Sequence, residues 1–141
     1  MARSIFLISC VSSKLDRPAP ARELYVSDLF RKARAYAEAS GQAWFVLSAE
    51  HGLVHPDTIV APYEKTLNAM PVSERRAWAD RVLVALEPHL QDVERVVFLA
   101  GKRYREFLEG PLSRRVLVEV PMAGLGIGRQ LQWLTRHLER P

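Results

Sequence analysis

Cysteine is nearly absent from this sequence, because Cys10 is the only one among 141 residues. A single cysteine excludes an intramolecular disulfide and favours a reducing compartment. Long apolar runs are missing as well, since no stretch approaches the roughly 18 consecutive apolar residues of a membrane-spanning helix. The first residues lead into a strand-like segment without a signal-peptide pattern. We therefore expect a cytoplasmic protein that has no membrane segment.

Repeats, low-complexity tracts and interdomain linkers are also missing. The chain has 48% hydrophobic and 26% charged residues, which is ordinary for a globular protein. A chain of this length buries roughly 68–70% of its unfolded surface. These features predict one domain spanning residues 1–141.

Basic residues outnumber acidic ones by 20 to 16, which gives a formal net charge of +4. This excess allows a polyanionic partner such as DNA, but enzymes that act on small anions have similar charges. The charge is thus compatible with DNA or a nucleotide as a partner but does not select it.

Four short runs rich in apolar residues are expected to be strands near residues 4–9, 43–48, 95–100 and 116–120, and the first two have the continuous apolar character of buried strands. Helical spacing is found at 28–40, where Ser27 is a good N-cap and Gly41 a good C-terminal cap. Other helices are expected from Ser73, at 103–108, and through the last residues after 127. Gly110 and Pro111 are expected to close the helix at 103–108.

Alternation of strands and helices predicts a three-layer α/β/α fold with a four-stranded, mainly parallel sheet in the order 2-1-3-4. Ligands of such sheets bind beyond the carboxyl ends of the strands. This rule selects the segments after the four strands, which we expect to converge: residues 9–14, 48–53, 100–104 and 121–128. Residues 48–71 read as one long loop, and such loops are usually functional.

The segment after the first strand offers a thiol, hydroxyls and an ammonium group from Cys10, Ser12, Ser13 and Lys14. These groups are candidates for holding a phosphate or carboxylate. A small phosphatase would place an arginine five residues after its reactive cysteine, but Arg17 lies too far along. Cys10 is equally well explained as a small buried apolar residue.

Candidate acid–base groups follow the second strand. Glu50 and His51 are adjacent, and Glu64 lies in the same long loop beyond Ser48, a candidate substrate contact. A carboxylate would orient water while His51 helps a leaving group depart. The alternative is a solvated Glu50 and a His51 bonded to the loop backbone. The histidines lack the spacing of a helical metal site, so neither a metal nor a cofactor is expected.

Other candidate ligand contacts lie further along the chain. Tyr63 is suited to stacking on a base, or to packing under the loop. Gly101, Lys102 and Arg103 put two cations just beyond the third strand. Gly124, Gly126 and Gly128 do not have the spacing of a dinucleotide-binding fingerprint. They suit a tight turn or a close approach of the backbone to a ligand.

Five segments together resemble an uncharacterised bacterial domain family often labelled YaaA-like peroxide-stress protein. They are Cys10-x-x-x-Lys14, Leu24-Tyr25-x-Ser27-x-Leu29-Phe30, Leu47-Ser-Ala-x-x-Gly52-Leu53, Pro62-Tyr63-Glu64-x-Thr66-Leu67 and Gly124-Leu-Gly126-Ile-Gly128. The resemblance implies DNA-linked or iron-linked protection in oxidative stress. The expected sheet also resembles the uracil-DNA glycosylase superfamily, although that superfamily's water-activating motif after the first strand is absent.

Two classes of function follow from these residues. In the enzyme interpretation, Glu50 or Glu64 positions water at an N-glycosidic bond, His51 helps the base leave and Tyr63 stacks on it. In the binding interpretation, the basic rim holds DNA or a nucleotide without chemistry. One pocket containing Cys10, Glu50, His51 and Glu64 would favour the enzyme, and a flat basic face would favour binding.

Overall fold

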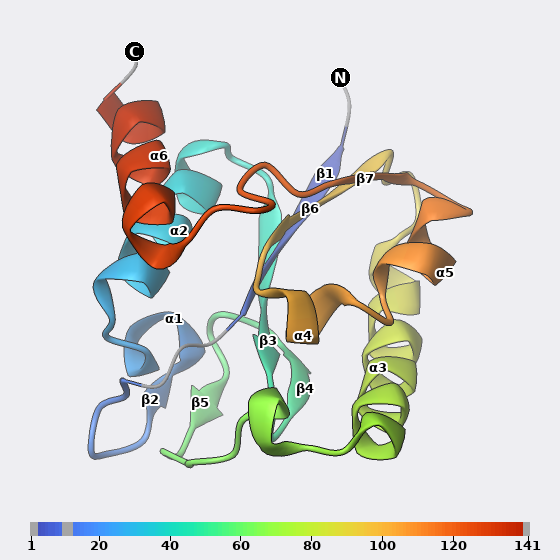
Figure 1. The fold of residues 1–141 in the computed structure, drawn as a ribbon, viewed down its shortest axis with the longest axis horizontal. Coiled ribbons are helices and arrows are strands. Elements are labelled where there is room, and N and C mark those ends of the chain that lie inside the picture. Colours follow the sequence, from blue (N-terminus) through green and yellow to red (C-terminus); the bar gives the residue numbers. More distant parts are fainter. Residues whose placement is uncertain (1–2, 10–12, 140–141) are drawn as a thin grey trace.

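The computed structural model describes residues 3–9 and 13–139 as a mixed α/β fold (Figure 1). Its elements, in chain order, are β1 (Ser4–Ser9), β2 (Ala19–Pro20), α1 (Ala21–Leu24), α2 (Asp28–Ala39), β3 (Ala43–Ser48), β4 (Gly52–Val54), β5 (Ile59–Val60), η1 (Leu67–Ala69), α3 (Val72–Leu86), η2 (Glu87–His89), β6 (Arg95–Leu99), α4 (Lys102–Arg105), α5 (Glu109–Ser113), β7 (Leu117–Glu119) and α6 (Ile127–Glu139).

The central sheet has five strands in the order β4-β3-β1-β6-β7. Every neighbouring pair is parallel except β3 and β4, which form an antiparallel hairpin. The prediction of four strands was therefore too low, because residues 52–54 belong to a strand and not to a loop. Residues 59–60 also leave the predicted loop, since β5 pairs with β2 in a separate small sheet.

Helix α2 begins where the sequence indicated. The Ser27 hydroxyl accepts a hydrogen bond of 3.1 Å from the Phe30 amide, which satisfies one of the free N–H groups of the first turn. Gly41 follows the helix with φ +73°, a left-handed conformation that glycine adopts without strain. Both predicted caps of this helix are confirmed.

Two helix predictions were wrong in detail. Helix α3 begins at Val72 after Pro71, so Ser73 lies inside the helix and does not cap it. Gly110 and Pro111 do not close a helix but lie in the first turn of α5. Proline is tolerated there because a first-turn N–H has no partner within the helix.

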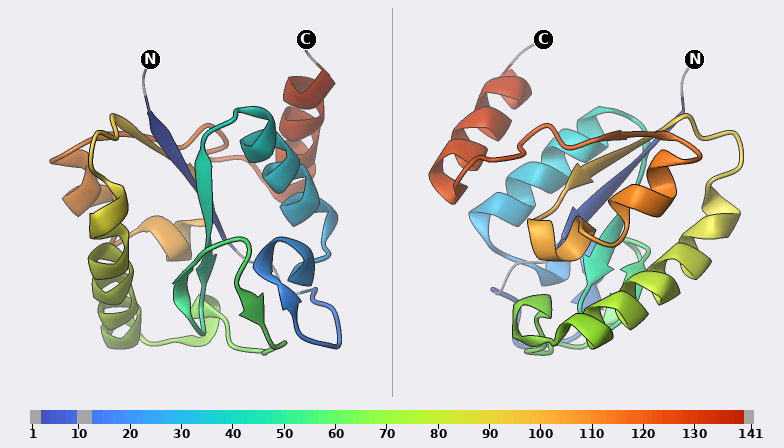
Figure 2. Two further views of the ribbon diagram at one scale, coloured as in Figure 1. Left: turned by 180° about the vertical axis from the view of Figure 1, so that it is seen from behind. Right: turned by 45° about the vertical axis from the view of Figure 1, so that its right-hand side comes forward.

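The helices lie on two sides of the sheet, with α2 and α6 on one and α3 and α5 on the other (Figures 1 and 2). Helix α2 contacts β1 and β3, while α6 packs mainly on α2. On the opposite side, Trp78 of α3 is 1% exposed, and its indole N–H donates to the Ser48 carbonyl at 2.8 Å. No helix in the described residues is long and apolar enough to cross a bilayer.

Candidate functional site

A cavity of about 720 Å³ opens where β1 and β6 end. Its volume lies within the usual range for small-molecule sites. It lies at the carboxyl ends of parallel strands, where open α/β sheets bind ligands. Six of the candidate residues line it: Lys14, Tyr63, Glu64, Gly101, Lys102 and Arg103.

One side of the cavity is apolar. Leu29, Phe30 and Ala33 come from α2, and Met122 and Ile127 come from the segment that enters α6. Phe30 is 1% exposed and Met122 is 7% exposed, so these side chains belong to the core as well as to the cavity. This side is suited to the flat, apolar faces of an aromatic ligand.

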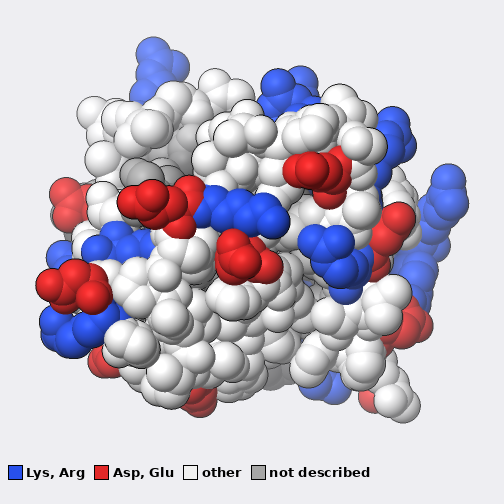
Figure 3. Space-filling model, turned by 90° about the horizontal axis from the view of Figure 1, so that it is seen from below, with Lys and Arg blue, Asp and Glu red and all other residues white. Residues whose placement is uncertain are grey.

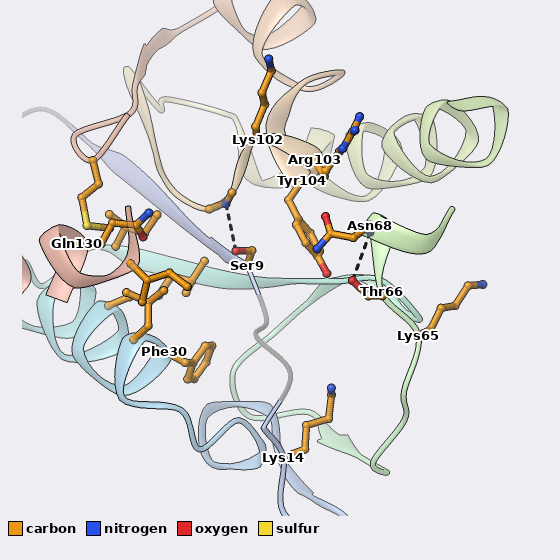
Figure 4. A pocket seen from close by; sticks show the side chains of 18 of the residues that line it. Ser9, Lys14, Phe30, Lys65, Thr66, Asn68, Lys102, Arg103, Tyr104 and Gln130 are labelled. Carbon is orange, nitrogen blue, oxygen red and sulfur yellow. Dashed lines mark hydrogen bonds between the residues drawn. The ribbon is translucent and has the colours of Figure 1, made fainter. Parts of the chain in front are cut away.

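Polar side chains are distributed around the apolar side. Figure 4 shows Gln130 on one side of the cavity and Asn68 and Tyr104 on the other. The Gln130 amide nitrogen donates to the Leu125 carbonyl at 2.8 Å, which fixes the carboxamide group. The Ser9 hydroxyl accepts a 3.4 Å hydrogen bond from the Gly101 amide and so joins the ends of β1 and β6.

The cations of the cavity point in different directions. In Figure 4, Lys14 extends into the cavity, whereas Lys65, Lys102 and Arg103 extend away from its centre and form a rim. Arg103 lies 3.7 Å from Glu106, which also pairs with the buried Arg75 at 3.1 Å. The Arg75 guanidinium donates in addition to the Met70 carbonyl at 2.5 Å. These bonds connect the rim to α3.

Lys14 is held in place by aromatic rings and by the backbone. Its ammonium nitrogen lies 4.6 Å from the centre of the Tyr63 ring and 5.7 Å from that of Tyr25. Its backbone forms an antiparallel bridge with Tyr25. Cation–π contacts of this kind stabilise a lysine in one position. The cavity therefore has a pre-organised positive charge.

Tyr63 also joins the cavity to the interior through its hydroxyl. The Ser48 hydroxyl donates to the Tyr63 hydroxyl at 2.7 Å, and the Tyr25 hydroxyl lies 2.7 Å from the same oxygen. Because Lys14 lies over the ring, that face of Tyr63 is already occupied. Ser48 is buried and does not line the cavity, so it acts on the site through Tyr63.

The residues between β3 and β4 form a turn that does not line the cavity, although the His51 ring packs edge-on against Tyr63 with ring centres 5.5 Å apart. We call residues 49–51 the hairpin tip. Gly52 follows it with φ +75°, and the His51 amide donates to the Ser48 hydroxyl at 3.0 Å. Glu50 and His51 are exposed, and neither lines the cavity. His51 instead lines a separate hollow of about 280 Å³ beside His55.

Of the four segments expected to converge, three contribute described residues to the cavity, namely 9–14 through Ser9 and Lys14, 100–104, and 121–128, whereas 48–53 contributes none. Residues 63–68, which we call the wall segment, take their place. Cys10 and Ser12 lie outside the described residues. Ser13 is exposed, and its carbonyl accepts a hydrogen bond from the Val26 amide.

The three late glycines do not line the cavity. Gly124 has φ +79°, which supports the tight-turn interpretation at that position. A Cβ atom at Gly124, Gly126 or Gly128 would meet no other atom within 4 Å. Close packing of the protein against itself therefore does not require glycine at these positions.

Several cavity residues were not identified as candidates from the sequence: Leu29, Phe30, Ala33, Lys65, Thr66, Asn68 and Gln130. Leu29, Phe30 and Thr66 do occur in the segments that carry the family resemblance. Helical spacing marks Phe30 and Ala33 as core residues, and the same spacing cannot reveal that one edge of the core opens into a cavity.

Acidic and basic side chains are interspersed on the surface of the protein (Figure 3). On the face seen from below in Figure 3, acidic side chains lie among the basic ones. Many arginines pair with carboxylates, including Arg22 with Asp57, Arg95 with Glu119 and Arg105 with Glu109. Within the described residues, no group of three or more His, Cys, Asp or Glu side chains is placed to hold a metal ion.

Comparison with known proteins identifies the family of this chain. The uncharacterized protein YfjM of Bacillus subtilis (strain 168) is 30% identical over 129 residues, which are 86% of this chain and 82% of that protein. No solved structure gives a significant match. A family described as "Family of unknown function (DUF6884)" matches residues 5–136. This chain therefore belongs to the DUF6884 family.

Proposed function

We propose that the cavity binds a nucleotide. The observation that carries this proposal is the combination of an apolar side and an inward-pointing Lys14 in one cavity at the carboxyl ends of β1 and β6. A base needs an apolar surface and polar groups at its edge, whereas a phosphate needs a cation. The cavity has an apolar side that suits the base and, at a separate place, the Lys14 cation that suits the phosphate.

The arrangement gives the nucleotide an orientation. The base lies toward Phe30, Ala33 and Met122, where the Gln130 carboxamide meets its polar edge. The phosphate lies near the Lys14 ammonium, and the rim cations Lys102 and Arg103 attract it. The resemblance of the sequence segments to YaaA-like proteins, and of the expected sheet to the uracil-DNA glycosylase superfamily, supports a ligand that contains a base.

Calorimetric titration with a panel of nucleoside monophosphates tests the proposal. Lys14→Gln is expected to weaken binding by about 10- to 100-fold, because a hydrogen bond to a charged group contributes roughly 1.5–3 kcal/mol. Arg81→Gln is the matched control, since Arg81 is exposed on α3 and does not line the cavity.

The outcomes separate clearly. If no nucleotide binds the parent protein, the proposal is wrong. If Lys14→Gln and Arg81→Gln bind as the parent does, the phosphate does not contact Lys14. A loss confined to Lys14→Gln, with unchanged thermal unfolding, supports the site.

Hydrolysis of an N-glycosidic bond is the second candidate function. Glu64 favours it, because this carboxylate lines the cavity in which the nucleotide would lie. In this reaction Glu64 orients a water that attacks the sugar C1′, the bond to the base breaks, and the base nitrogen takes a proton. DNA binding without chemistry is the alternative.

A further inference from the structure

We infer that the ligand is a free mononucleotide with one phosphate group, and not a nucleotide within a DNA or RNA strand. This inference rests on the proposed function and narrows its substrate class. Three features of the described residues support it. One lysine points into the cavity, carboxylates lie among the cations around its mouth, and the aromatic rings are not exposed for stacking on further bases.

Inside the cavity, positive charge is concentrated at one point. Lys14 points inward, whereas Lys65, Lys102 and Arg103 extend away from the centre (Figure 4). An inward lysine matches one terminal phosphate. A nucleotide within a strand carries a phosphate on each side, and both would need cations along the path of the strand.

Around the mouth, the cations are interspersed with carboxylates. Glu64 lines the cavity itself, and Glu106 lies 3.7 Å from Arg103. On the face seen from below, acidic and basic side chains are likewise interspersed and form no continuous basic stripe (Figure 3). Flanking phosphates of a strand would meet these acidic groups, whereas a mononucleotide has a single phosphate to place, and Lys14 provides the cation for it.

Stacking platforms for flanking bases are also missing. Proteins that hold single strands stack successive bases on aromatic rings. No Phe, Tyr or Trp in the described part of the chain is exposed. Three of the four half-buried rings have a covered face, because Lys14 lies over Tyr63, Arg76 over Phe107 at 4.4 Å, and His137 stacks on Trp133 at 3.8 Å. The fourth, Tyr36, packs edge-on against Phe6 and Trp133. A strand would therefore gain little beyond the nucleotide in the cavity.

Competition between monomers and strands tests this inference. The probes are the four deoxynucleoside 5′-monophosphates and the four matching homo-oligonucleotides of about 12 nucleotides without terminal phosphates, a length within the usual site sizes for single strands. Each is titrated into the parent protein and into Lys14→Gln. Arg81→Gln again serves as the charge-matched control.

The expected result is that a monophosphate binds at least tenfold more tightly than the matching strand, and that Lys14→Gln removes this preference. Raising salt from about 50 to 200 mM should weaken monophosphate binding by less than about tenfold, because few counterions are released. A strand that binds more tightly than its monophosphate overturns the inference but leaves nucleotide binding intact. Absence of binding by both kinds of probe overturns the proposed function itself.

Discussion

The hairpin tip and the wall segment come from the same stretch of sequence, but they differ in what they contact. Glu50 and His51 of the tip are exposed, whereas Tyr63, Glu64 and Thr66 of the wall line the cavity. The wall is anchored by Leu67, which is fully buried. The tip follows a strand of the central sheet directly and still does not line the cavity. Closeness in sequence to the carboxyl end of a strand is therefore insufficient to place a side chain in the site.

The antiparallel strand β4 explains the difference. Ser48 pairs with Gly52, so the chain reverses immediately after β3 and the tip becomes a tight turn. After β5, the chain returns past Lys14 and passes along the cavity. The Ser48 hydroxyl connects the regions, because it accepts from the His51 amide and donates to Tyr63. The hairpin thus supports the wall of the cavity without entering it.

The largest expected contrast is between the carboxylates of the two regions. If the protein releases a base from nucleotides, Glu64→Gln should reduce the rate by roughly 10²- to 10⁴-fold, as expected for loss of a general base. Glu50→Gln should leave the rate within about threefold, because Glu50 lies outside the cavity. Chromatographic measurement of released base with the parent and both variants checks this. If Glu50→Gln lowered the rate more than Glu64→Gln, the catalytic carboxylate would be Glu50 of the hairpin tip.

Substitutions of Tyr63 are expected to have smaller effects on nucleotide affinity, and two variants distinguish the role of its ring from that of its hydroxyl. Tyr63→Leu removes the ring beside Lys14 and should weaken nucleotide binding by about 2- to 30-fold, the equivalent of roughly 0.5–2 kcal/mol. Tyr63→Phe keeps the ring and should retain affinity. It should still lower the free energy of unfolding by about 1–3 kcal/mol, because Ser48 and Tyr25 lose a hydrogen-bond partner. Titration and urea unfolding of both variants provide the two readouts. Equal affinity losses in both variants would contradict a role for the ring.

Substitution of Gly52 is expected to give the smallest effect. It should change the stability of the hairpin without changing nucleotide binding at the wall segment. Gly52→Ala places a side chain at φ +75° and should cost about 1–2 kcal/mol of folding stability. Nucleotide affinity should stay unchanged, because Gly52 does not line the cavity. Denaturant unfolding with parallel nucleotide titration checks both points. A clear loss of affinity in folded Gly52→Ala would show that the hairpin shapes the site more directly than its contacts indicate.

The sequence predicted helices and strands best where interactions between residues close in sequence determine them. Ser27 caps α2 through a bond to Phe30, three residues away, and Gly41 supplies the positive φ that follows the helix. The apolar runs that became β1, β3 and β6 are buried on both faces, as their continuous apolar character indicated. Strand β4 was missed because Gly52-Leu53-Val54 is too short to show a period and gains its order from pairing with β3.

The sequence by itself determined a mainly parallel α/β domain with candidate ligand groups beyond its strands, because strand length, helix caps and apolar spacing are local properties. Only the tertiary structure decided which candidates meet. It brought Lys14, Phe30 and Gln130 to one cavity and left Glu50 and His51 outside its lining. That choice depends on the β3–β4 hairpin and on packing between segments far apart in the chain. The physical reason is that long-range pairing and core packing fix the direction of each loop, and neither has a signature in a short stretch of residues.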